Sequence, residues 1–206
     1  MDQPQEQASL KTLRYKDLVL HKRYQSLEHL YDTHGGRGFR LDLGCGYVKP
    51  PGFIGLDNLS GEASQIPNAE NAPDILMNLN REPFPFPDNS CEEVRSSHFL
   101  EHSDVLHILN ESHRVLRPGG IFLFAVPYAN SAEGMYPGHM QFFTERWFYE
   151  NITFREKFKI DKEQYFPSVY YQKLPRLVRW LLPFRFARVF LFNACWQMMF
   201  WCSAKK

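Results

Sequence analysis

Apolar residues in the first two thirds of the chain gather in short runs that glycine, proline and polar residues separate. The run from Ile121 to Val126 is almost entirely apolar, which is typical of a parallel strand that is buried on both faces. Four other runs have the length of strands and are bounded by turn residues. The pattern predicts strands at residues 38–43, 53–57, 74–79, 92–97 and 121–126.

Apolar residues at helical spacing predict three helices in the same part of the chain. The first covers residues 13–31 and ends before a pair of glycines. The second covers residues 105–115, follows the candidate capping residues Ser103 and Asp104, and ends before a Pro-Gly-Gly sequence. A short third helix is expected at residues 145–151. Strands and helices therefore alternate, as in an α/β fold with a parallel sheet.

The connection between the first two predicted strands is unusually short. Only six residues, 47–52, separate the turn after the first strand from the second strand, and Pro50 and Pro51 are two of them. A parallel crossover usually takes about a dozen residues and contains a helix. We therefore expect this crossover to lack a helix.

Aromatic residues make up 16% of the chain and collect near its carboxyl-terminal end. From Tyr171 onward there are seven basic residues and no acidic one. Pro183 should divide this segment into two helices, and the uncharged stretch 189–202 is shorter than the roughly 20 residues that span a bilayer. The pattern predicts a hydrophobic, basic helical extension at 169–206, with 174–202 in peripheral contact with an anionic membrane surface. Alternatively, these residues cover the sheet or form a dimer contact.

Charge and cysteine content narrow the possible classes of protein. The 206 residues carry a formal net charge of +1, which argues against a nucleic-acid partner. The four cysteines form no Cys-x-x-Cys pair, so neither a metal site nor a disulfide framework is expected. The polar segment 1–9 has no apolar signal core. We expect a cytoplasmic location, at the inner face of the membrane if the carboxyl-terminal segment binds there, and predict no oligomeric state.

A glycine-containing turn follows the first predicted strand and carries the strongest functional signal. Gly44 and Gly46 let a ligand approach the backbone closely, and ligands of open parallel sheets lie at the carboxyl ends of the strands. Asp57 ends the second strand and can accept hydrogen bonds from both hydroxyls of a ribose. The pattern predicts a nucleoside-containing ligand; a tight turn without a ligand is the alternative. A nicotinamide enzyme is disfavoured, because Lys49 replaces the third glycine of the dinucleotide fingerprint.

Several motifs, taken together, resemble those of class I S-adenosylmethionine-dependent methyltransferases of the type 11-like, short form with a compressed first crossover. The blocks are LDLGCG at 41–46, FPFPDNS at 84–90, SSHFLEH at 96–102 and HRVLRPGG at 113–120. The resemblance implies a Rossmann-like, mostly parallel seven-stranded sheet within a methyltransferase domain at residues 1–168. It also implies that residues 154–166 supply closing antiparallel strands and that the cofactor is S-adenosylmethionine.

The same resemblance implies roles for individual residues. Gly44 and Gly46 would keep the loop clear for the methionine part of the cofactor. Asp42 would meet its ammonium group directly or through water, and Asp57 its ribose hydroxyls; both could instead be acids that stabilise the loop. Asn78 stands where many relatives carry an aspartate that receives the adenine amino group. The predicted cofactor-binding residues are Asp42, Gly44, Cys45, Gly46, Asp57, Asn58, Asn78, Leu79, Ser97 and His98.

The resemblance implies transfer of a methyl group from the cofactor to an acceptor. A hydroxyl acceptor must lose its proton, and His139 and His98 are the predicted catalytic residues, because histidine titrates near neutral pH. For His139 and His102 the alternative is a histidine that is bonded to backbone in a packed loop. The predicted acceptor is a hydroxyl of a sugar or a lipid-linked glycan. Methylation of another small molecule or lipid, and cofactor binding without catalysis, are the other candidate functions.

Overall fold

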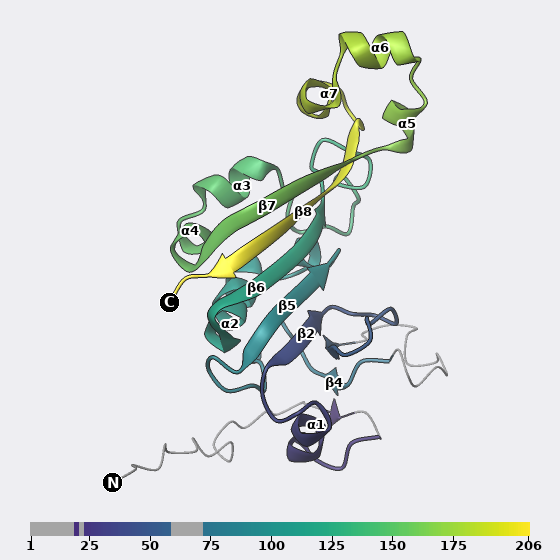
Figure 1. Ribbon diagram of the computed structural model, residues 1–206. Helices are drawn as coiled ribbons and strands as arrows, with labels where there is room; N and C mark the ends of the chain where they lie inside the picture. Colours follow the sequence, from purple (N-terminus) through teal and green to yellow (C-terminus); the bar gives the residue numbers. More distant parts are fainter. Residues whose placement is uncertain (1–18, 21–22, 59–71) are drawn as a thin grey trace.

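The computed structural model describes residues 19–20, 23–58 and 72–206 (Figure 1). They form one eight-stranded sheet with the order β1-β4-β3-β2-β5-β6-β8-β7. The strands are β1 (Val19–Leu20), β2 (Phe39–Leu43), β3 (Ile54–Asp57), β4 (Ile75–Leu76), β5 (Cys91–Ser97), β6 (Leu116–Pro127), β7 (Phe158–Pro167) and β8 (Cys195–Ala204). Strands β4, β3, β2, β5 and β6 pair in parallel, whereas β1, β8 and β7 join antiparallel. The mostly parallel sheet that the sequence predicts is confirmed.

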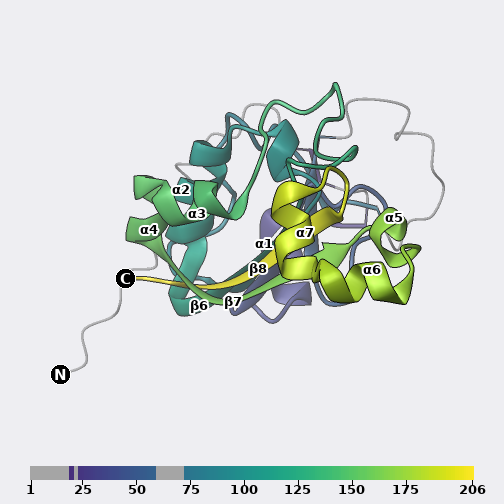
Figure 2. The ribbon, with the colours of Figure 1, turned by 90° about the horizontal axis from the view of Figure 1, so that it is seen from above.

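Helices cover the sheet and connect its strands. They are α1 (Leu27–Thr33), the 3-10 turn η3 (Leu100–His102), α2 (Val105–Val115), α3 (Glu145–Glu150), α4 (Ile152–Lys157), α5 (Val169–Gln172), α6 (Arg176–Leu181) and α7 (Phe184–Phe190). Figure 2 shows α2, α3 and α4 together on one face of the sheet. Asp104 caps α2 as predicted, because its carboxylate accepts a hydrogen bond from His107 N at 3.2 Å.

Stacked phenylalanines join that helical layer to the sheet. Phe124 of β6 lies with its ring centroid 4.8 Å from Phe148 of α3, 6.0 Å from Phe154 of α4 and 5.2 Å from Phe200 of β8. All four side chains are at most 1% exposed. Aromatic pairs at these separations add to the burial of their apolar surface. This core holds β6 and β8 together and therefore fixes the position of the carboxyl end of β6.

The amino-terminal prediction is partly wrong. Within the described residues of the predicted helix 13–31, helix α1 begins only at Leu27, where Ser26 accepts a hydrogen bond from His29 N. Val19–Leu20 instead form β1, which pairs with β4 and adds an eighth strand to the predicted seven. The unpaired edge of β4 offers backbone hydrogen bonds that helical spacing alone does not reveal. Residues 13–18 and 21–22 lie outside the described residues.

The first crossover contains no helix between β2 and β3, as predicted. The predicted strand at 74–79 is shorter, because β4 ends at Leu76. Asn78 begins a turn there: its side-chain oxygen accepts a hydrogen bond from Asn80 N, and its carbonyl accepts one from Arg81 N, both at 3.1 Å. An asparagine that bonds the backbone two residues ahead stops a strand.

The predicted helical extension at 169–206 is helical in its first part, where α5, α6 and α7 lie, and wrong in its last part. Its last part forms β8, which lies between β6 and β7 inside the sheet. Burial alternates along most of β8, with Phe200, Cys202 and Ala204 buried and the residues between them half-buried. The lack of charge in 195–202 therefore reflects a sheet interior, whereas 189–193 lie outside the sheet, at the end of α7 and in the loop that follows it. The predicted closing strands within 154–166 are also corrected: α4 occupies the beginning of that range, and β7 alone follows it.

The helical part of this region is an insertion between two neighbouring strands. We call residues 169–193, which contain α5, α6 and α7, the insertion. Figure 1 shows its three helices projecting where β7 ends and β8 begins. Tyr171 and Ala187 of the insertion pack with Ala194, the residue that follows it, in a small core separate from the main one. Among the described residues, no helix is long and apolar enough to cross a bilayer.

Candidate functional site

The loop after β2 contains two glycines, and a side chain is disfavoured at each of them for a different reason. Gly44 and Gly46 have φ angles of 63° and 50°, in the left-handed region that favours glycine. A Cβ at Gly44 would lie 2.3 Å from Cγ of Phe99, so packing excludes a side chain there. At Gly46, no described atom lies within 4 Å of the same position. The loop thus leaves open space beside its backbone at Gly46, as a bound cofactor requires.

Asp57 lies at the end of β3, beside this open space. Its Oδ2 accepts a hydrogen bond from Gly46 N at 2.8 Å, which orients the carboxylate. A carboxylate has about four lone-pair positions, so this bond leaves capacity for the hydroxyls of a ribose. Asn58, the next residue, is exposed. Asp57 and Gly46 therefore come together as the sequence predicts.

Asp42 is fully buried one strand away and is paired with an arginine. Both carboxylate oxygens accept hydrogen bonds from Nη1 of Arg95 on β5, at 2.8 and 2.9 Å. Burial raises the pKa of Asp42 to about 6, against the opposing effect of Arg95. Sequence reasoning missed Arg95, although parallel strands place it directly opposite Asp42.

Cys45 has a packing role. Its thiol is buried against Gly55, where an added Cβ would lie 2.6 Å from Sγ. Burial raises the pKa of the Cys45 thiol well above its usual range, so a reactive thiolate is disfavoured. The side chain fills the space between β2 and β3 and keeps the glycine loop close to the second strand.

Asp74 was not among the predicted site residues, yet it joins the crossover to the sheet. It is fully buried and accepts hydrogen bonds from Lys49 Nζ at 2.6 Å, Gly55 N at 2.7 Å and Tyr24 Oη at 2.9 Å. Arg23 also pairs with it. The hydrogen bond from Lys49 leads the contacts that hold the pKa of Asp74 below its usual value, despite burial. Lys49, which breaks the dinucleotide fingerprint, is thus a structural cation.

The residues that the sequence predicts to contact adenine lie just after β4. Leu79 is buried and Asn78 is half-buried. The side-chain oxygen of Asn78 already accepts the hydrogen bond from Asn80 N. An amide oxygen has two lone pairs, so one acceptor position is left for an adenine amino group.

His98 follows the half-buried Ser97 at the end of β5, and its backbone and ring are held on several sides. Its φ of 53° is rare for a residue with a side chain. Nε2 lies 2.8 Å from Oε1 of Gln197, Nδ1 lies 3.5 Å from Oε1 of Glu101, and the ring stacks on Trp196 with centroids 5.7 Å apart. Glu101, followed by Gln197, raises the pKa of His98 against the effect of burial. Glu101, Trp196 and Gln197 are site residues that sequence reasoning missed.

His139 lies in the loop that follows β6 and comes close to the end of β5. Its ring centroid is 4.6 Å from that of His102 in an edge-on contact. The loop is attached to η3, because Met140 N and Gln141 N donate to the carbonyl of Glu101 at 2.8 and 3.1 Å. The structure therefore brings His139 next to the turn η3, which follows His98 closely in the chain.

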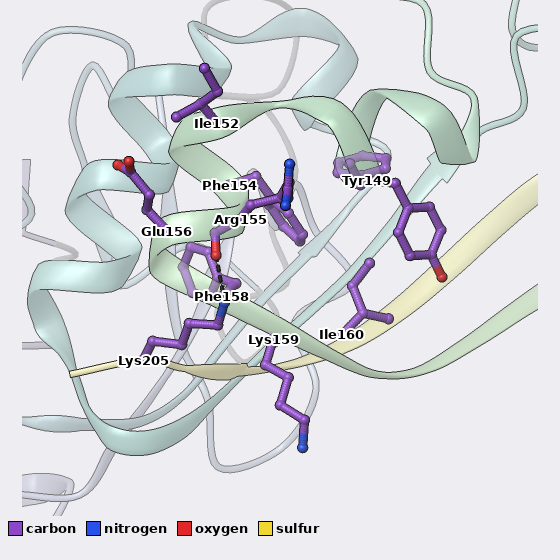
Figure 3. Close-up of a pocket in the computed structure, with 10 residues that line it drawn as sticks. Tyr149, Ile152, Phe154, Arg155, Glu156, Phe158, Lys159, Ile160 and Lys205 are labelled. Atoms are coloured by element: carbon purple, nitrogen blue, oxygen red, sulfur yellow. Dashed lines mark hydrogen bonds between the residues drawn. The ribbon is translucent and has the colours of Figure 1, made fainter.

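Two cavities of similar size lie at opposite ends of the sheet. The larger, of about 500 Å³, is lined by residues of α3, α4 and β7, including Tyr149 and Ile152 (Figure 3). It lies at the start of β7, away from the glycine loop. The other, of about 480 Å³, has Tyr170, Asn193 and Trp196 among its lining residues. Since Trp196 stacks on His98, the second of these two cavities is the one that adjoins the site.

Comparisons with known proteins agree with this geometry. Residues 41–124 match the family model of a methyltransferase domain. No curated protein sequence matches the chain. The matched range holds β2 to β6 as far as Phe124, including the glycine loop, Asp57 and Glu101.

Solved structures at low identity share the fold. An S-adenosylmethionine-dependent methyltransferase from Archaeoglobus fulgidus has 15% identity and a TM-score of 0.60, over 87% of this chain and 93% of that one. The cyclase SpnF has 17% identity and a TM-score of 0.56, over 88% and 82%. A chain of the Haloferax volcanii complex between the Trm112 methyltransferase activator and a putative methyltransferase has 18% identity and a TM-score of 0.52, over 86% and 89%.

The observations converge on one enzyme class. Strand order β4-β3-β2-β5-β6-β8-β7, an open glycine loop and an acid at the end of the second parallel strand occur together. The family match covers these elements up to β6, and the cofactor of the family is S-adenosylmethionine. The chain carries a methyltransferase domain at residues 41–124 and is an S-adenosylmethionine-dependent methyltransferase with the class I fold.

Proposed function

We propose that this enzyme methylates a hydroxyl group of a sugar, within a lipid-linked glycan. The observation that carries this proposal is the cavity beside His98. Trp196 and Tyr170 offer aromatic faces, and Glu133, Gln172 and Asn193 offer hydrogen-bonding groups in the same wall. Sugar rings present apolar faces and a rim of hydroxyls, so they suit such a mixed lining.

The cofactor residues are assigned on the geometry of the glycine loop. Gly46 leaves room for the cofactor, Asp57 accepts its ribose hydroxyls, and Asn78 and Leu79 hold its adenine. Asp42 acts from below the loop on the ammonium group, through water or directly. The cofactor supplies an activated methyl group, and the chain supplies proximity and orientation, which together lower the barrier by about 7–11 kcal/mol.

Of the two predicted catalytic histidines, His139 is the one that acts on the acceptor hydroxyl. Nε2 of His98 already bonds Gln197, and its Nδ1 faces the carboxylate of Glu101 at ion-pair distance, 3.5 Å, without a hydrogen bond. Nδ1 of His139 lies 3.2 Å from the carbonyl of Gly134, so this nitrogen carries the proton and Nε2 keeps a lone pair. His98 instead positions groups at the end of β5.

The surface of the insertion supports contact with an anionic membrane. Trp180, Phe190 and Leu177 are 74%, 75% and 67% exposed. Residues 169–193 contain no acidic side chain, and Lys173 and Arg176 are exposed among the apolar groups. Such a surface suits the boundary between lipid headgroups and acyl chains. Since the insertion starts where β7 ends, membrane contact would place a lipid-linked acceptor near the site.

A transfer assay tests the acceptor. Purified enzyme is incubated with methyl-labelled S-adenosylmethionine and, separately, with sugar nucleotides, lipid-linked glycans and membrane extracts. We expect label in a glycan fraction and an equal yield of S-adenosylhomocysteine. Tyr170→Ala should lower this transfer, and Tyr149→Ala, at the distant cavity, serves as its matched control. Cofactor binding with no product from any acceptor would instead support a binding-only domain, and label in a non-glycan metabolite would replace the proposed acceptor.

Liposome co-sedimentation tests the membrane contact. The comparison uses anionic and neutral vesicles, with a Trp180→Ser, Phe190→Ser double variant. Ile152→Ser, which is 69% exposed in wild type and lies far from the insertion, is the control. We expect wild type and the control to sediment with anionic vesicles and the double variant to stay in solution. Equal behaviour of all three proteins would contradict membrane contact through the insertion.

A further inference from the structure

We propose that Glu101, His102 and His139 bind one divalent transition-metal ion on the acceptor side of the site. Each residue offers a ligand atom, and the three atoms lie within 4.8 Å of one another. Two imidazoles and a carboxylate are a donor set that Mn²⁺, Fe²⁺, Co²⁺ and Zn²⁺ accept. The sequence predicts no metal site, because the cysteines form no Cys-x-x-Cys pair; the two histidines lie 37 positions apart, so local spacing does not reveal the cluster.

The histidines are already oriented as metal ligands are. Nδ1 of His102 lies 3.1 Å from the carbonyl of Gly138, and Nδ1 of His139 lies 3.2 Å from the carbonyl of Gly134. A carbonyl only accepts hydrogen bonds, so each Nδ1 is the protonated nitrogen and each Nε2 carries a lone pair. Metal-binding histidines are typically held in this way, with the second ring nitrogen donating to a backbone carbonyl.

The carboxylate supplies an independent observation. Glu101 is 1% exposed, and neither of its side-chain oxygens has a hydrogen-bond partner among the described residues. Nδ1 of His98 lies 3.5 Å from Oε1, an ion-pair distance when His98 is protonated but too long for a good hydrogen bond, and Oε2 has no hydrogen-bond partner among the described residues. Burying a carboxyl group without hydrogen bonds is costly. A metal ion would provide the missing ligand for its oxygens.

The backbone holds the three ligands in one place. The carbonyl of Glu101 accepts the hydrogen bonds of Met140 N and Gln141 N, which follow His139 directly. Glu101 and His102 belong to the same 3-10 turn. The loop after β6 and the turn after β5 therefore form a single support, and a simple packed-loop histidine would need neither the second imidazole nor the unpartnered carboxylate.

The role of the ion rests on the proposed function, although its binding does not. Three protein ligands leave coordination positions for a hydroxyl of the acceptor. A cation lowers the pKa of an oxygen acid that it binds, so the hydroxyl proton can leave to water. The oxygen then forms its bond to the methyl carbon as the carbon–sulfur bond of the sulfonium breaks. In this arrangement His139 acts on the hydroxyl as a ligand of the ion rather than as a free base.

Direct metal titration tests the site. Untagged full-length protein, first treated with a chelator, is titrated calorimetrically with Mn²⁺, Co²⁺ and Zn²⁺, and the Co²⁺ complex is examined by visible absorption. We expect one ion per chain, with loss of at least about tenfold in affinity in His139→Ala, His102→Ala and Glu101→Gln. His29→Ala, which changes an exposed histidine far from the cluster, should bind as wild type does.

The outcomes separate this inference from the proposed function. His102 is exposed, so His102→Ala should fold even if a change at the buried Glu101 does not, and unchanged S-adenosylmethionine affinity confirms the fold. Absence of a one-to-one site in wild type, or equal affinity in His102→Ala and wild type, overturns the metal site. Methyl transfer that survives chelation while His139→Ala abolishes it would keep the proposed function and make His139 a base.

Discussion

Two fully buried carboxyl groups in this enzyme have opposite surroundings. Asp74 accepts hydrogen bonds from Lys49, Tyr24 and the backbone of Gly55, and it also pairs with Arg23. Glu101 accepts none from the described residues, apart from the distant approach of His98. One carboxylate is saturated and stabilises the sheet, whereas the other is left ready for a partner from outside. The number of hydrogen bonds that a buried carboxylate accepts thus distinguishes the structural acid from the candidate functional one.

The largest expected effect on stability is at Asp74, the carboxylate with several hydrogen-bond partners. Asp74→Asn leaves Lys49 and Arg23 without their carboxylate, and loss of one partner of a buried ion pair costs about 3–5 kcal/mol. Chemical denaturation at pH 7 measures the free energy of unfolding. Glu150→Gln, which breaks the exposed Arg146–Glu150 pair, is the control and should cost no more than about 0.5 kcal/mol. Equal effects of both changes would show that Asp74 is not a structural acid.

The pH dependence of stability distinguishes Asp42 from Asp74. The pKa of Asp42 is raised from its ordinary value to about 6, so its contribution to stability is complete below about pH 4 and is lost as pH rises through about 6. Asp42→Asn removes this loss. We expect the free energy of unfolding of the variant, relative to wild type, to rise by about 3 kcal/mol between pH 4 and pH 7.

Asp74 serves as an internal control, because its pKa is shifted in the opposite direction to that of Asp42. The pKa of Asp74 is lowered, so its stabilising effect is present above the pKa of the unfolded chain and disappears on acidification. The difference between Asp74→Asn and wild type should therefore shrink as pH falls below about 4. The free energies of unfolding of wild type and Asp42→Asn could instead differ by the same amount at pH 4 and pH 7. That result would mean that the pKa of Asp42 is not raised.

Cofactor affinity should respond to Asp57 by an intermediate amount. Asp57→Ala removes the acceptor for the ribose hydroxyls and for Gly46 N, and unsatisfied polar groups cost about 1–3 kcal/mol. Calorimetric titration with S-adenosylmethionine measures the change. Glu133→Gln, in the acceptor cavity, should leave cofactor affinity unchanged. Unaltered binding by Asp57→Ala would place the ribose elsewhere.

The smallest effect is expected at Glu101. Glu101→Gln keeps the shape of the side chain, removes no hydrogen bond among the described residues, and weakens only the long ion pair with His98 at 3.5 Å. The free energy of unfolding should therefore change by less than about 1 kcal/mol. Methyl transfer should nevertheless fall sharply. A loss of stability as large as that of Asp74→Asn would erase the contrast between the two acids and point to a structural role for Glu101.

The parallel half of the sheet was predictable because its signals are local. Gly44, Gly46 and Asp57 stand beside the strands that they terminate, and the short crossover follows from counting residues 47–52. The pairing of Asp42 with Arg95 depends on the register between strands 53 residues apart, which no local pattern contains. The same limit hid the approach of His139 to Glu101.

The antiparallel end of the sheet was misread for a physical reason. The segment 195–204 is apolar and lacks charges, which suits both a buried strand and a membrane-bound helix. The neighbouring strands decide between the two. Phe200 of β8 pairs with Phe124 of β6 on one side and with Glu163 of β7 on the other. These partners lie far away in sequence, so hydrophobicity alone could not distinguish the two outcomes.

The insertion begins and ends at almost the same place. Ser168 N donates to the carbonyl of Ala194 at 2.8 Å, and β7 and β8 pair directly beyond that point. Residues 169–193 can therefore be cut out and replaced by a tight turn, which would leave an ordinary β-hairpin at the edge of an intact sheet. The insertion and the wall that it gives to the cavity beside His98 can therefore change independently of the strands that form the cofactor site, so one core can carry different accessory segments.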